Sequence, residues 1–179
     1  MPSPDICACI TSSDDLGLAT AVGDLVSLYE VRIDLIGEDW PRVVAGLSRP
    51  WIACDRLASQ GGSCDCDEDV RVAVLHRAIA LGASIVDMEM SAQGARQFIN
   101  DVKGRARVLI SHHDFERTVE EEALVEVVRL QRNMGADICK VVTTARCVED
   151  SVTMLQLVRR FRSEGIVAFA MGQIHDFGL

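Results

Sequence analysis

The chain has 179 residues, of which 49% are hydrophobic, 25% charged and only 4% aromatic, as in a globular domain with an aliphatic core. Its formal net charge of −9 argues against a nucleic-acid partner, which would require a basic surface. The first residues lack the basic start and apolar run of a signal peptide, and no apolar stretch approaches the roughly 18 residues of a transmembrane helix. We therefore expect a cytoplasmic protein that binds neither nucleic acid nor membrane.

The chain repeats a unit in which a short apolar strand is followed by an amphipathic helix. Seven strands are predicted, at 5–11, 25–35, 51–56, 84–90, 107–113, 137–144 and 166–171. Helices are predicted at 67–81, 120–133 and 149–162. This alternation predicts a parallel sheet, and a closed barrel of such units needs roughly 200 residues or more. We therefore expect an α/β fold of the TIM (β/α)8-barrel type with about seven strands, a single domain over 1–179 that lacks the last strand–helix unit.

Charged and imidazole side chains gather near the C-terminal ends of the predicted strands. The second strand ends with Glu30, Arg32 and Asp34 at alternating positions, which would place all three on one face. The later strands end in Cys54-Asp55-Arg56, Asp87-Met88-Glu89, Ser111-His112-His113 and the segment around Lys140. In a parallel sheet or barrel these ends meet at the edge where active sites are built. We predict an enzyme-type pocket there, with Asp34, Asp87 and Glu89 as structural ion-pair partners.

Lys140 stands in the apolar, β-branched run 137–144, where an ammonium is costly to bury unless it is paired or loses its proton. It is either an edge-strand lysine whose ammonium reaches water or a deprotonated lysine that acts as a nucleophile. Nearby Arg32 and Arg56 would lower the Lys140 pKa by like-charge repulsion, which favours the nucleophile. A lysine imine acidifies the adjacent carbon of a ketone substrate, and His113 is the natural base for that proton. The surplus of arginines indicates an anionic substrate.

Seven cysteines are an odd number in a chain too large to need disulfides, so we expect reduced thiols. The pairs Cys7-x-Cys9 and Cys64-x-Cys66 leave one residue between the thiols, whereas structural zinc sites usually leave two to four. Cys7 and Cys9 also fall in an apolar strand, where cysteine acts as a small hydrophobe. We expect no metal and no cofactor.

With these residues placed, the chain resembles type I 3-dehydroquinate dehydratase, a Schiff-base enzyme, over nearly its whole length. The shared motifs occur in order as Tyr29 through Asp34, Arg56 through Gly62, Val86 through Glu89, Ser111 through Phe115, Gly135 through Lys140, and Ala170 through Gly172. The resemblance implies a hydro-lyase of the shikimate pathway of aromatic amino acid biosynthesis, which removes water from 3-dehydroquinate to give 3-dehydroshikimate. It also implies a TIM barrel and a possible homodimer.

The resemblance assigns roles to particular residues. It implies that Lys140 forms the imine and that His113, rather than His112, is the general acid and base. The implied substrate-binding residues are Glu30, Arg32, Arg56 and Met171. Gln60 stands where the family has a glutamate that supports the catalytic histidine, and Leu179 where it has an arginine that holds the substrate carboxylate. We therefore expect impaired activity. The alternatives are an inactive remnant or binding subunit, and a Schiff-base lyase or aldolase acting on another oxo acid.

Overall fold

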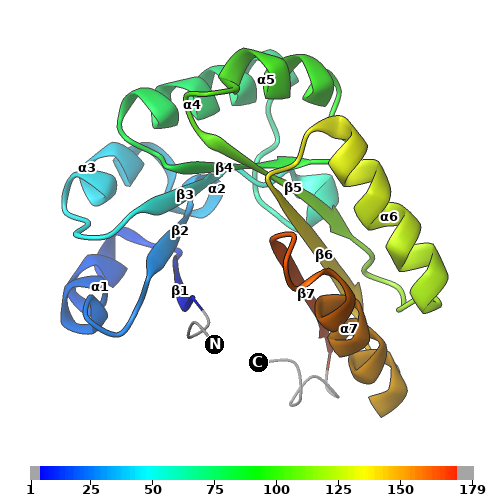
Figure 1. The fold of residues 1–179 in the computed structure, drawn as a ribbon. Coiled ribbons are helices and arrows are strands. Elements are labelled where there is room, and N and C mark those ends of the chain that lie inside the picture. Colours follow the sequence, from blue (N-terminus) through cyan, green and yellow to red (C-terminus); the bar gives the residue numbers. More distant parts are fainter. Residues whose placement is uncertain (1–4, 173–179) are drawn as a thin grey trace. The chain divides into compact units, whose positions relative to one another are not determined.

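The structure, a computed structural model, describes residues 5–172; residues 1–4 and 173–179, the latter including Leu179, lie outside the described part. Seven strands alternate with helices along the described residues (Figure 1), as the α/β expectation requires. The chain divides into two compact units, the first holding residues up to Asp87 and Val102–Arg107, the second holding Met88–Asp101 and residues from Val108 onward. The expectation of a single barrel domain stays a prediction. None of the helices within 5–172 has the length and apolar character of a membrane span.

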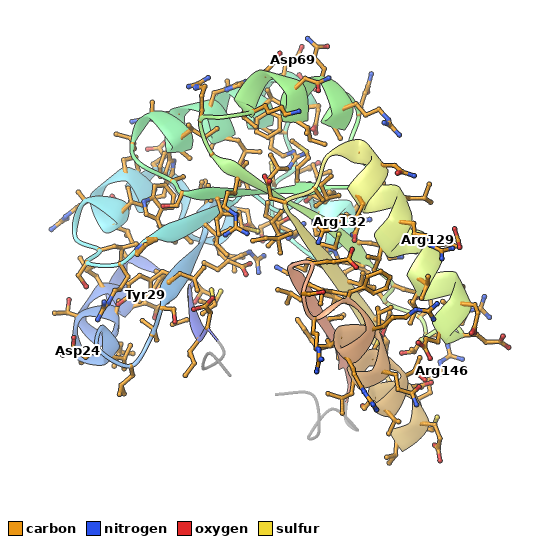
Figure 2. All side chains as sticks on the ribbon, viewed as in Figure 1. Asp24, Tyr29, Asp69, Arg129, Arg132 and Arg146 are labelled. Carbon is orange, nitrogen blue, oxygen red and sulfur yellow. The ribbon has the colours of Figure 1, made fainter. Side chains whose placement is uncertain are left out.

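The first unit contains strands that pair in parallel and in chain order. They are β1 (Cys7–Ile10), β2 (Leu28–Arg32), β3 (Trp51–Cys54) and the first residues of β4 (Ile85–Glu89). The helices are α1 (Leu16–Val22), α2 (Ile33–Ile36), α3 (Trp40–Ala45) and α4 (Glu68–Ala80), with 3-10 turns η1 (Ser13–Asp15), η2 (Gly37–Asp39) and η3 (Ala58–Gln60). Tyr29 of β2 is fully buried, and its hydroxyl donates to the Ala19 carbonyl of α1 at 2.6 Å (Figure 2). This bond ties the first helix to the sheet.

The second unit carries the later strands, again paired in parallel and in chain order. Its elements are the end of β4, α5 (Ala95–Val102), β5 (Arg107–His113), α6 (Glu121–Met134), β6 (Ile138–Thr144), α7 (Val148–Phe161) and β7 (Ile166–Met171), of which α5 and β5 each extend by one residue into the first unit. Helix α6 packs on β6 and α7 on β7 (Figure 1). Gly135 follows α6 with a φ of +103°, a left-handed conformation that favours glycine and ends the helix where the sequence predicts. Leu124, Val128, Met154 and Leu157 form the helical side of the core.

The second strand is shorter than the sequence pattern predicts. We predicted a strand over 25–35, but β2 ends at Arg32 and Ile33–Ile36 form a short helix. Because the backbone turns into a helix, Asp34 is not the next member of an alternating strand face. The prediction of one strand face for Glu30, Arg32 and Asp34 is therefore wrong for Asp34, whose carboxylate folds back onto Arg32.

Candidate active site

Lys140 lies in the middle of β6 and is buried, with 8% of its surface exposed. The neighbouring Cys139 places its Sγ 3.8 Å from the Val128 carbonyl oxygen of α6. Because side chains alternate along a strand, Lys140 points to the face of the sheet opposite α6. Its backbone is held from the helix side, since the Gln131 side-chain amide donates to the carbonyls of Lys140 at 2.9 Å and Ile110 at 3.0 Å. The buried Gln131 was not predicted from the sequence; a polar residue on the apolar face of α6 is the signal that could have found it.

The strand register separates the two adjacent histidines. Ser111 pairs with Lys140, and His113 pairs with Val142. Paired residues of parallel strands share a face, so Ser111, Lys140 and His113 lie on the same face, while His112 lies on the face toward α6. His113 and Lys140 are diagonal neighbours, whose Cα atoms are about 8 Å apart in a regular sheet. Ser111 was not predicted as a site residue, although its place two residues before His113 already put it on this face.

The surroundings of the two histidines also differ. The His113 ring stacks on Phe115 with centroids 5.8 Å apart and an interplanar angle of 10°. Burial lowers the pKa of His112, and the charge of Asp114 opposes this shift only in part. Asp114 itself is fixed by its backbone amide, which donates to a β6 carbonyl at 2.8 Å. His113 is half-buried, as is Met171, which ends β7 on the face that carries Lys140.

In the first unit, Arg32 and Arg56 are each bonded to a buried carboxylate. Arg32 donates from Nε and Nη2 to Asp34 at 2.9 and 2.7 Å, and Arg56 donates from Nη2 to Asp87 at 2.5 Å. The prediction that Asp34 and Asp87 each form a structural ion pair is confirmed. Burial raises the pKa of Asp34, but the bonds from Arg32 and from backbone amides outweigh it and leave the pKa below its usual value. The same contact raises the pKa of Arg32, so this pair stays charged.

Among the described residues, Glu30, Cys54 and Asp87 form a cluster with the spacing of a metal site. Their ligand atoms lie within 4.8 Å of one another. Glu30 is half-buried, and Cys54 and Asp87 are buried. Arginines lie beside this cluster: Arg56 binds Asp87, and the charge of Glu30 is among the causes that raise the Arg32 pKa. These arginines offset the carboxylate charge that would otherwise attract a cation.

Gln60 ends the 3-10 turn η3, is half-buried, and has its side-chain nitrogen 3.5 Å from the Ser59 carbonyl. Two residues after Gln60, Gly62 lies so close to the backbone of Arg56 that a Cβ at this position would stand 2.0 Å from the Arg56 carbonyl oxygen. Only glycine permits this approach. The predicted site residues thus fall in two groups, each gathered within its own unit. The first unit holds Glu30, Arg32, Arg56 and Gln60, and the second holds His113, Lys140 and Met171.

Comparison with known proteins gives a consistent set of relatives. The family model for type I 3-dehydroquinase matches residues 6–175. The 3-dehydroquinate dehydratase of Dehalococcoides mccartyi is 34% identical over 175 residues, which cover 97% of this chain and 78% of the relative. The solved 3-dehydroquinate dehydratase of Enterococcus faecalis has a TM-score of 0.83 at 26% identity, covering 98% of this chain and 82% of its own. A type I enzyme from Clostridium difficile has a TM-score of 0.88 at 18% identity, covering 99% and 79%. These structures confirm the expected fold class.

Proposed function

The chain belongs to the type I 3-dehydroquinase family, and on that premise we propose that it is a hydro-lyase converting 3-dehydroquinate to 3-dehydroshikimate through a Schiff base on Lys140. The observation that carries the proposal is that the buried Lys140 of β6 lies on the same face of the sheet as His113 of β5. A lysine amine is a nucleophile toward a ketone, and a diagonal imidazole is within reach of a substrate bound to that lysine. The reaction would place the protein in the shikimate pathway.

In the proposed reaction, the Lys140 amine attacks the substrate ketone, and water leaves to give a protonated imine. The imine withdraws electrons from the adjacent carbon, so His113 removes a proton there. The resulting enamine expels the substrate hydroxyl group, which takes the proton back from His113 and leaves as water. Hydrolysis of the imine then releases the product and regenerates Lys140. No cofactor enters any of these steps.

The proposed anion-binding residues are Arg32 and Arg56, with Glu30 and Met171 beside the substrate. Asp34 takes two of the five N–H donors of Arg32, which holds the guanidinium plane in one orientation. The remaining donors suit a carboxylate or hydroxyl group of the substrate. In place of the family's glutamate, Gln60 supplies a neutral amide, which cannot stabilise an imidazolium as a carboxylate does. We therefore expect slower turnover than with glutamate at this position.

Turnover tests the proposal directly, through the ultraviolet absorption of the conjugated product. The chain has two lysines, so Lys103, which is exposed, supplies a matched control. Lys140→Met should abolish product formation, and Lys103→Met should leave it unchanged. A wild-type chain that dehydrates another oxo acid but not 3-dehydroquinate would indicate a different Schiff-base lyase. Equal turnover by the wild type and Lys140→Met would overturn the proposal.

A further inference from the structure

Two thiols in the loop after β3 take no part in the proposed reaction. The Sγ atoms of Cys64 and Cys66 lie 2.7 Å apart. Cys64 is half-buried and Cys66 is exposed, and both line a cavity of about 570 Å³ within the first unit. We propose that Cys64 and Cys66 are a redox-active dithiol, which a small cationic disulfide oxidises to an intrachain disulfide.

The sulfur–sulfur distance favours a disulfide over a bound metal ion. A disulfide bond is about 2.05 Å long, so the two sulfurs need to approach by only about 0.7 Å. Two thiolates bound to one tetrahedral zinc at about 2.3 Å lie roughly 3.7 Å apart, about 1 Å farther than here. The cluster of residues 5–172 that has the spacing of a metal site, Glu30 with Cys54 and Asp87, includes neither of these cysteines. The pair is thus positioned for a bond between its own sulfurs.

Cys7 and Cys9 have the same spacing in sequence and serve as an internal comparison. Both lie on β1, where residues two apart share a face and have Cα atoms about 6.6 Å apart. A disulfide requires Cβ atoms about 3.8 Å apart, which an extended strand does not allow. Both residues are exposed, so a reagent reaches them as well. A difference in disulfide formation between the two pairs would therefore report backbone geometry rather than access.

The charge around the thiols selects the class of oxidant. The cavity is lined by four carboxylates, Asp34, Glu38, Asp55 and Asp65, of which Asp34 is paired with Arg32, and by one cation, Arg77. The Arg77 guanidinium lies over the Trp40 ring at 5.4 Å. A negative field attracts a cationic disulfide such as cystamine and repels an anionic one such as glutathione disulfide, and salt screens both effects.

The oxidation proceeds by two thiol–disulfide exchanges. The exposed Cys66 thiolate attacks one sulfur of the oxidant and releases the first small thiol. Cys64 then loses its proton to solvent and attacks the Cys66 sulfur, which releases the second small thiol and leaves the protein disulfide. Burial, with Cys66 and Asp55, raises the pKa of Cys64 to about 12. The second exchange should therefore be slow at neutral pH and faster as the pH rises.

The loop that carries the thiols is hydrogen-bonded to Asp34, which binds Arg32, and to the backbone of Arg56. The Ser63 amide donates to the Asp34 carboxylate at 3.0 Å, and Asp34 in turn binds Arg32. The Cys64 amide donates to the Arg56 carbonyl at 3.0 Å. Closing a ring from Cys64 to Cys66 changes the backbone torsions of this loop. Oxidation should therefore alter the surroundings of Ser63 and Arg32.

Peptide mapping tests the proposal without any measurement of activity. The reduced full-length chain is treated with cystamine or glutathione disulfide at pH 8, in low and high salt, and remaining thiols are alkylated. Trypsin releases Cys64 and Cys66 together in peptide 57–71, and Cys7 and Cys9 together in peptide 1–32. Peptide 57–71 should lose two hydrogens and escape alkylation, several-fold faster with cystamine than with glutathione disulfide in low salt. Peptide 1–32 should form no internal disulfide.

Variants and spectra complete the test. Cys64→Ser should trap a stable mixed disulfide on Cys66, and Asp65→Asn should reduce the preference for cystamine. The amide signal of Ser63 and the Nε signal of Arg32 should shift in nitrogen-edited NMR spectra when the wild type is oxidised, but not in Cys64→Ser. An internal disulfide that fails to form under excess cystamine, or that forms no faster than one between Cys7 and Cys9 in the folded chain, would overturn the proposal. Equal rates for both oxidants in low salt would refute the assigned class.

Discussion

Replacing Asp34 should release Arg32 and destabilise the first unit. The Asp34 carboxylate is fully buried and accepts two bonds from Arg32, one from the Ser63 amide and one from the Arg56 amide. Removing one partner of a buried ion pair costs about 3–5 kcal/mol. The Arg32 side chain is 19% exposed and can regain part of its hydration, so we expect about 2–4 kcal/mol for Asp34→Ala. Asp34→Asn keeps one acceptor and should lose about 1–2 kcal/mol.

Urea unfolding at pH 7 measures this loss, with Asp39→Asn as the control. Asp39 is an exposed acid in a 3-10 turn and makes no side-chain cap bond, so its replacement should change stability by less than about 0.5 kcal/mol. The effect should also depend on pH. Because the folded pKa of Asp34 is lowered, its contribution is present above the unfolded pKa of about 3.9 and is lost as the pH falls through the folded value. The wild type and Asp34→Asn should therefore converge in acid.

The same substitution links the ion pair to the proposed activity. If Asp34 orients Arg32 for the substrate, Asp34→Asn should raise KM for 3-dehydroquinate several-fold while changing kcat less. An unfolding free energy within about 0.5 kcal/mol of the wild type at pH 7 would refute the reasoning, because the buried pair would then contribute nothing. An unchanged KM with the expected loss of stability would limit Asp34 to a structural role.

Three further outcomes follow from the second unit and from the turn at Gln60. Burial lowers the pKa of His112 despite Asp114, so below a pH of about 6.5 the unfolded chain binds a proton that the folded chain does not. The stability of the folded chain should therefore fall as the pH drops below about 6.5. In thermal melts, His112→Phe should flatten this dependence of stability on pH. Gln131→Met removes the side-chain donor to the carbonyls of Ile110 and Lys140, which stay in the β5–β6 ladder, and should cost about 1 kcal/mol in urea unfolding. Gln60→Glu should raise kcat for 3-dehydroquinate and shift the basic limb of the pH–rate profile upward; an unchanged profile would remove Gln60 from the proposed site.

The strands and long helices could be predicted because their apolar periodicity and glycine punctuation agree. The short helix Ile33–Ile36 could not, since Val31, Ile33 and Leu35 also fit a strand that alternates with charges. Four helical residues give too few turns for a helical period to emerge. The position of Asp34 depends on that helix. The pattern thus predicted that Asp34 forms an ion pair, but neither its partner nor its geometry.

The buried face of α7 shows a second limit. The sequence places Val152, Leu155 and Val158 on one apolar face, yet Val152 is 45% and Leu155 47% exposed. The structure instead buries Met154 and Leu157, together with the polar Ser151. Two stripes of this helix are apolar, and periodicity alone does not decide which one the sheet covers.

In the candidate site, too, part of the arrangement could be predicted from the sequence and part could not. The family resemblance selected His113 rather than His112, and the strand register places His113 on the face of Lys140 and His112 on the face toward α6. The loop that leads to Cys64 and Cys66 contains the left-handed Gly61 and the close approach of Gly62 to Arg56, and a spacing rule contains neither feature.

Borohydride trapping tests the central claim most directly. The chain is incubated with 3-dehydroquinate, reduced with borohydride, digested and mapped by mass spectrometry, with Lys140→Met and Lys103→Met in parallel. A Schiff-base enzyme should give a covalent adduct on the peptide that contains Lys140, present in Lys103→Met and absent from Lys140→Met. An adduct confined to Lys103, or none while the wild type still turns substrate over, would contradict the account.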